Sequence, residues 1–165
     1  MAKNVKEINV ISRWGVLVLG EAGKEQRFFS LVQRVLEERG WPFPVKLEDV
    51  GEGWFGAKKQ YLETKGPYGK LVAYVGAETI GRDIYLSWSL TLDEPGLFKK
   101  AVAAGGGFAA EIFQAVNFNQ ANAARAFASS LNHAVQQAAD IILDEAGADK
   151  SKVNREAQGI LGRLI

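Results

Sequence analysis

The segment RDIYLSWSLTL, residues 82–92, decides the fold of this chain. Apolar side chains occupy every second position from Ile84 to Leu92, and Asp, Tyr, Ser and Thr fill the positions between them. A period of two is typical of a β-strand that turns one face to a core and the other toward solvent. The segment therefore predicts an antiparallel sheet that helices cover on one side only.

Further strands are expected on both sides of this segment. Residues 71–77 form a hairpin with it across 78–81, and residues 45–50 form a short strand. Residues 57–65 carry so many lysines and acids that we expect a strand near an edge of the sheet. Residues 8–19 are rich in β-branched residues and end in the apolar run 16–19, which predicts a strand buried on both faces.

Helical periodicity appears in two places. Residues 24–39 carry one apolar face and end before Gly40, which suits the position after a helix, and Trp41 and Phe43 are expected to cover that helix end. A long helix is expected from Asn119 to about Ala146, with a seam at positions 124, 128, 131, 135, 138 and 142. Asp149 or Ser151 then caps a last short helix to about Gln158.

The order is strand, helix, four strands, then helices only. It predicts an α+β fold with two layers: a mainly antiparallel sheet of about five strands with helices on one face, then a long C-terminal helix and a short terminal helix. We expect one domain overall, in which residues 1–96 form the sheet core. Residues 97–165 form a helical region that packs on the sheet, on another copy, or on both.

Composition removes several classes of chemistry. The chain has 165 residues, no cysteine, one histidine and a net charge of +1. Disulfides, thiol catalysis and sulfur-ligated zinc are therefore excluded, as are sites that need several histidines, and no metal or other cofactor is expected. The low net charge gives no strong nucleic-acid signal. The polar N-terminus and the lack of a long apolar run lead us to expect a cytoplasmic protein.

The loop after the first strand is a candidate anion site. Gly20, Gly23 and Lys24 lie between an apolar strand and a helix start, the context in which backbone amides receive phosphate. The spacing differs from that of a phosphate-binding loop, since two residues separate the glycines and Glu25 follows the lysine. An ordinary strand-to-helix turn explains the same residues.

The single histidine does not form a catalytic constellation. His133 lies on the long helix four residues after Ser129, and Asp140 is about 10 Å further along the helix axis. Neighbours on one helix seldom make a nucleophile–base pair, so a polar helix face is the simpler interpretation. No catalytic residue is assigned.

Three functions stay open. The first is a non-catalytic protein-interaction or assembly domain that binds itself or another protein, because a helix of roughly 40 Å exceeds a small sheet and its projecting seam would need a cover. The expected interaction face comprises Asn122, Phe127, Leu131, His133, Val135, Ile142, Ile160, Leu161 and Leu164. The second is a small anion- or nucleotide-binding module, or a weak enzyme, in a sheet–helix pocket rimmed by Lys24, Trp54, Tyr85 and His133. The third is a peripheral membrane protein that uses residues 97–116.

Overall fold

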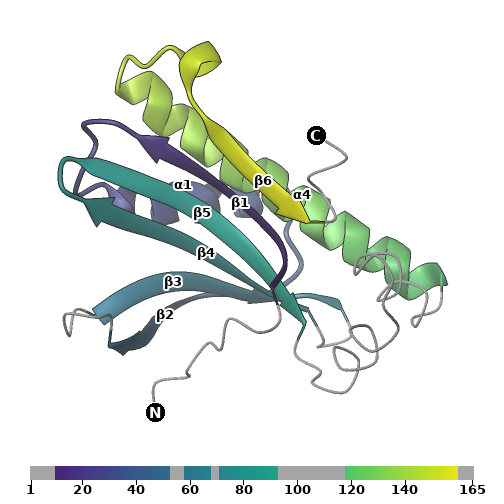
Figure 1. The fold of residues 1–165 in the computed structure, drawn as a ribbon. Coiled ribbons are helices and arrows are strands. Elements are labelled where there is room, and N and C mark those ends of the chain that lie inside the picture. The colour runs from purple at the N-terminus through teal and green to yellow at the C-terminus, as the bar shows by residue number, and fades with distance from the viewer. Residues whose placement is uncertain (1–9, 53–57, 68–70, 93–117, 160–165) are drawn as a thin grey trace, which may run out of the picture.

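A computed structural model describes residues 10–52, 58–67, 71–92 and 118–159 (Figure 1). Six strands form one sheet in the order β2-β3-β4-β5-β1-β6, and every neighbouring pair is antiparallel. The elements, in chain order, are β1 (Val10–Val18), α1 (Glu25–Glu38), β2 (Val45–Glu52), β3 (Lys58–Lys65), β4 (Leu71–Ile80), β5 (Asp83–Leu92), α4 (Phe118–Glu145), the 3₁₀ turn η3 (Lys150–Lys152) and β6 (Arg155–Gly159).

The molecule has two layers, as expected from residues 82–92. Both helices lie behind the sheet in the view of Figure 1, so the face toward the viewer carries neither of them. On the sheet face that packs against the helices, Trp14 is the register partner of Trp88, and Trp88 is the register partner of Val75. All three are buried under the helices. The α+β architecture predicted from the sequence is confirmed.

The alternation in β5 is also confirmed. Ile84, Leu86, Trp88 and Leu90 are buried, whereas Tyr85, Ser87 and Ser89 on the opposite face are partly exposed. The strand pairs with β4 along its whole length across a turn at Gly81, whose φ of 64° suits glycine.

β1 corrects the sequence-based expectation of a strand buried on both faces. Trp14, Val16 and Val18 are buried, but Leu17 is 43 % exposed and Leu19 is 71 % exposed. The reason is topological, because β1 lies between antiparallel neighbours in a sheet whose described helices, α1 and α4, both pack on one face. An apolar run at the end of a strand is no guide to burial on both faces.

α1 buries the apolar face that its periodicity predicts, with Phe29 added to it. Gly40 follows at φ 67°, and the amide of Trp41 bonds the carbonyl of Leu36. The rings of Trp41 and Phe43 both lie against Phe127 of α4. The two aromatic residues thus cover the helix end, as expected, and join α1 to α4.

The seam of α4 is buried within its own chain. All six seam positions, from Ala124 to Ile142, are 9 % exposed or less. They pack with α1 and the helix-facing side of the sheet in one continuous core. The described part of the helix therefore does not leave its apolar stripe projecting, which differs from what its length suggested.

The chain end differs from the expected short helix. Asp149 does act as a cap, since its side chain accepts from the amide of Ser151, but η3 lasts three residues. Residues 155–159 then form β6, which pairs with β1 from Val16↔Arg155 to Ser12↔Gly159. Five polar or small residues carry no strand pattern of their own, so the open edge of β1 decides their conformation.

Candidate functional site: the open sheet face and its cleft

The sheet face that no described helix covers has its own row of side chains across the strands. Gly15, Ser87, Gly76 and Tyr61 are successive register partners from β1 to β3. A Cβ built on Gly76 would lie 2.9 Å from Cε1 of Tyr61, and one on Gly15 would lie 2.1 Å from Oη of Tyr85. The two glycines therefore let two tyrosine rings lie close against the sheet. We call this surface the open face.

Tyr85 lies on this face near charged residues of two other strands, Arg13 of β1 and Glu156 of β6. Partial burial raises the pKa of its hydroxyl, the carboxylate of Glu156 raises it further, and Arg13 acts in the opposite direction. The phenol is therefore neutral at ordinary pH and is able both to donate and to accept a hydrogen bond. A rigid ring with a polar end is a common contact in protein interfaces.

Exposed apolar side chains gather at one end of the open face. Leu17 is the register partner of Tyr85, Ile80 is that of Asp83, and Leu19 directly follows the last β1–β5 pair, Val18↔Ile84. Leu17, Leu19 and Ile80 are 43 %, 71 % and 61 % exposed, and they account for three of the four large exposed hydrophobic residues in the described part of the chain. We call these three residues with Tyr85 the apolar end.

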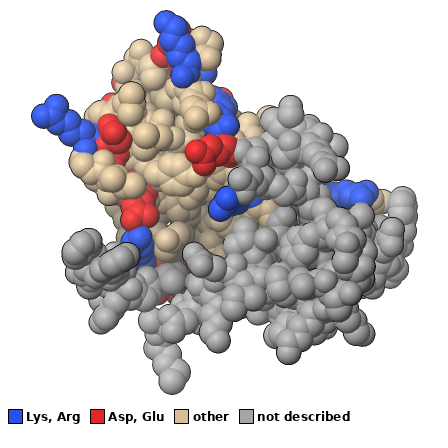
Figure 2. All heavy atoms as spheres, in the orientation of Figure 1, with Lys and Arg blue, Asp and Glu red and all other residues tan. Residues whose placement is uncertain are grey.

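Charges on the open face are mixed in sign. Lys59 pairs with Glu78 at 2.6 Å, and Lys65 with Glu63 at 3.8 Å. Figure 2 shows the described part of this face as mainly uncharged, with lysine, arginine and acidic side chains scattered over it. The described residues of this face therefore do not form a basic surface of the kind that phosphate backbones require.

A cleft opens beside the open face where two neighbouring strands diverge. The β3–β4 ladder ends at Tyr61↔Gly76, although both strands continue beyond that pair. The resulting cleft has a volume of about 590 Å³. Its lining residues come from α1, β2, β3, β4 and β5: Glu25, Gln26, Phe29, Asp49, Lys59, Gln60, Tyr61, Gly76, Ala77, Glu78, Thr79, Tyr85 and Ser87.

Hydrogen bonds between side chains span this cleft, where the backbone pairing of β3 with β4 has ended. Gln26 of α1 donates to Gln60 at 2.6 Å, and Gln60 donates to Asp49 of β2 at 3.1 Å. Thr79 donates to Glu25, and the Lys59–Glu78 pair bridges β3 and β4. Three carboxylates and one ammonium group thus line the cleft, which favours a cationic guest over an anionic one.

The expected anion site at the first loop has its donors occupied. The amide of Gly20 donates to Asp83 at 2.9 Å, that of Gly23 to Thr79 at 2.9 Å, and that of Ala22 to the carbonyl of Arg82. Lys24 forms an ion pair with Glu21. Gly20 and Gly23 both have positive φ, so they act here as turn residues that fix the loop to the β4–β5 hairpin.

The residues of the expected interaction face are dispersed. Four of them, Phe127, Leu131, Val135 and Ile142, are buried in the chain's own core, while Asn122 and His133 are exposed on α4. Ile160, Leu161 and Leu164 lie outside the described residues, as do Trp54 and the segment 97–116. Of the three expected rim residues that the structure describes, Lys24, Tyr85 and His133, only Tyr85 lines the cleft.

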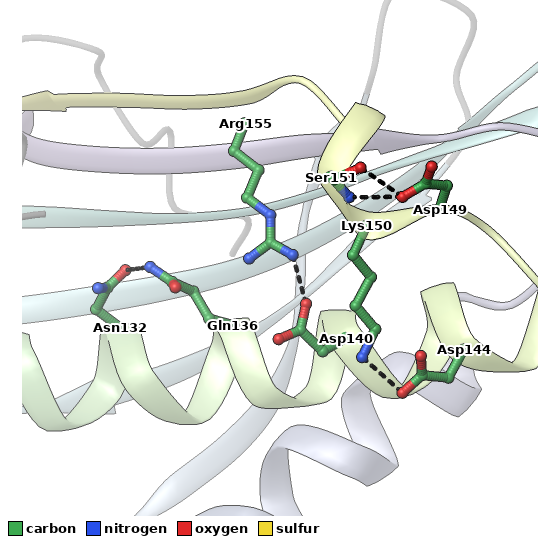
Figure 3. A network of polar contacts seen from close by, with 8 residues as sticks. All are labelled: Asn132, Gln136, Asp140, Asp144, Asp149, Lys150, Ser151 and Arg155. Atoms are coloured by element: carbon green, nitrogen blue, oxygen red, sulfur yellow. Dashed lines mark hydrogen bonds and ion pairs between the residues drawn. The ribbon is translucent and has the colours of Figure 1, made fainter.

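A second polar cluster holds the chain end in place (Figure 3). Arg155 reaches from β6 to Asp140 of α4 at 2.5 Å, and Lys150 of η3 donates to Asp144 at 2.7 Å. Further along α4, Gln136 donates to Asn132, which also accepts from the indole of Trp88 at 2.9 Å. All these groups are partnered within the chain, so the cluster is structural.

Sequence reasoning missed Gly15, Gly76, Leu17 and Ile80. Two isolated glycines inside strand patterns were the available signal, because an interior strand glycine often marks a close approach. The exposure of Leu17 and Ile80 follows only from the topology.

Within the described ranges there is no group of three or more acidic or histidine side chains that would hold a metal ion. In the same ranges no helix has both the length and the apolar character needed to cross a bilayer. Comparison with protein-family models, with curated proteins and with solved structures finds no match to this chain.

Proposed function

We propose that this chain is a non-catalytic protein-interaction domain, which binds another protein or a second copy of itself through the open face of its sheet. The observation that carries the proposal is the apolar end. Leu17 is the register partner of Tyr85, Ile80 lies diagonally across from Tyr85 as the partner of Asp83, and Leu19 is exposed just after β1 ends, all at the end of the sheet where β1 and β4 finish and β5 begins. Contiguous exposed apolar groups on one face are typical of interaction surfaces, whereas isolated ones are ordinary.

The surface has the composition that protein partners use. The apolar end with its tyrosine, adjoined by paired charges such as Lys59–Glu78, has the apolar and polar parts that protein interfaces combine. The interaction that we propose uses the sheet rather than the seam of α4, since that seam is already covered within the chain.

We extend the proposal to a cytoplasmic location, which the cysteine-free composition favours.

The two other functions have less support. An anion or nucleotide site at Gly20, Gly23 and Lys24 lacks free donors, and the cleft is lined by more carboxylates than cations. Membrane contact through residues 97–116 lies outside the described residues and stays a prediction, for which liposome flotation is the test.

Site-specific photocrosslinking tests the proposal. The full chain is expressed with p-benzoylphenylalanine at position 17, in the apolar end, or at Ser30, which is exposed on α1 in the other layer. We expect one dominant adduct from position 17, identified by mass spectrometry as a second copy or as one other protein, and little from position 30. Adding Ile80→Asp to the position-17 chain should remove the adduct. Equal or scattered labelling at the two positions would contradict the proposal.

A further inference from the structure

The end of β4 beyond its ladder with β3 presents backbone groups toward the cleft. The carbonyl of Leu71 accepts from Gly66 on the β3 side at 2.8 Å. Because backbone groups alternate in direction along a strand, those of Thr79 also point toward β3. Thr79 lies three residues past the last ladder pair, Tyr61↔Gly76, so its N–H and C=O have no ladder partner among the described residues of β3.

A short free edge of this kind is suited to an extended peptide. Strand addition to an exposed edge uses the main chain for affinity and pockets for alternate side chains for selectivity. The cleft supplies such a pocket directly beside Thr79, with a volume of about 590 Å³ that exceeds one amino-acid side chain. Its opening adjoins the apolar end, because Tyr85 belongs to both.

The residues that line the cleft favour a positively charged side chain of a bound segment. Glu25, Asp49 and Glu78 contribute carboxylates, and the bonds that they accept from Thr79, Gln60 and Lys59 each reach one oxygen only. Lys59 is the single cation among the described residues of the lining. The rings of Tyr61 and Tyr85 add π-faces on the same side, which attract ammonium and guanidinium groups.

We propose that the cleft binds an extended segment of a protein partner that inserts a lysine or arginine side chain toward Glu78, while its backbone pairs with Thr79. The inserted cation competes with Lys59 for Glu78. This inference rests on the proposed function and deepens it, since it names the chemistry of the partner segment.

Titration of the purified full chain with short peptides tests the inference. The probe is the pentapeptide Ser-Val-Arg-Val-Ser with blocked ends, and the control peptide has norleucine in place of arginine. We expect saturable NMR shifts at the amides of Thr79, Gln60 and Tyr85 with the arginine peptide only, weakening as salt is added. Absence of saturable binding up to roughly 1 mM peptide would overturn the inference, since a contact of this size should register there.

Three variants should change the affinity for the arginine peptide in different directions. Glu78→Gln should weaken binding by about tenfold, as loss of a charge-assisted bond does. Lys59→Gln releases Glu78 from its internal partner and should strengthen binding, by about threefold on the scale of an exposed ion pair. Glu63→Gln removes a carboxylate of the same face outside the cleft and should change nothing. Equal affinity in Glu78→Gln and the unsubstituted chain would overturn the inference.

The peptide titration and the photocrosslinking have independent outcomes, so a failure of this inference can be told apart from a failure of the proposed function. Loss of peptide binding with retained crosslinking from position 17 would leave the interaction domain in place and remove the cleft from it. Peptide binding without crosslinking would show a basic-peptide site while contradicting an interface at the apolar end.

Discussion

At the residue scale, the buried amide of Asn132 fixes how α4 lies on the sheet. Its side-chain oxygen accepts from the indole N–H of Trp88, and both residues are buried. Asn132→Leu leaves that N–H without its acceptor, so we expect the free energy of unfolding to fall by about 1–3 kcal/mol in urea denaturation. Ser130→Ala, on the exposed side of the same helix, should be neutral. A neutral Asn132→Leu would mean that the indole finds another partner.

Gly15 and Tyr85 form a second pair whose contribution is measurable. An alanine Cβ at position 15 would overlap the Tyr85 hydroxyl and ring, so Gly15→Ala should lower stability by about 1–3 kcal/mol. The same substitution in a Tyr85→Ser background should cost much less. A double-mutant cycle by thermal unfolding measures this coupling, and additive effects would show that the ring moves aside freely.

At the scale of elements, an ion pair on the surface joins α1 to α4. Arg27 of α1 bonds Glu145 of α4 at 2.5 Å, and this bond lowers the pKa of the Glu145 carboxyl below its usual value. A carboxyl with a lowered pKa stabilises the fold above its unfolded pKa, and that contribution is lost as pH falls through the folded pKa.

Glu145→Gln should therefore flatten the loss of melting temperature between about pH 6 and about pH 3, by a small amount because the pair is exposed. Glu37→Gln is the matched control, since it removes an exposed carboxylate from α1 and leaves Arg27 intact. Circular dichroism melts over this pH range measure the difference. Identical profiles for Glu145→Gln and the unsubstituted chain would contradict it.

The elements also show where sequence reasoning succeeds. Strand β5 and the two helices follow from periodicity, because their burial is set by one face each. Periodicity does not predict β6, because its five residues carry no apolar pattern and its partner β1 lies more than a hundred residues earlier. The divergence of β3 from β4 could not be predicted from the sequence either, because it depends on where the hydrogen-bonded pairing of the two strands ends. The candidate site is made of such features, so only Tyr85 was found in advance.

At the scale of the molecule, the role of the chain end is testable by truncation. A chain ending at Gly147 lacks β6 and exposes the edge of β1 from Ser12 to Val16. Exposed edges template association, so we expect a lower melting temperature and a larger mass in light scattering than for the full chain. This is the opposite of the result expected if the tail were the assembly element, for which truncation gives monomers. A truncated chain as stable and as small as the full one would contradict the role of β6.

The order of strands in the sheet has a consequence for synthesis. β1 emerges from the ribosome first, yet Val16 pairs with Leu86 and Arg155, which are 70 and 139 positions later. At translation rates of about 5–20 residues per second, β1 waits several seconds for its first neighbour and longer for its second. Until β5 emerges, β1 lacks both of its neighbouring strands. We therefore expect the nascent chain to depend on ribosome-associated chaperones, and slower translation should prolong that dependence.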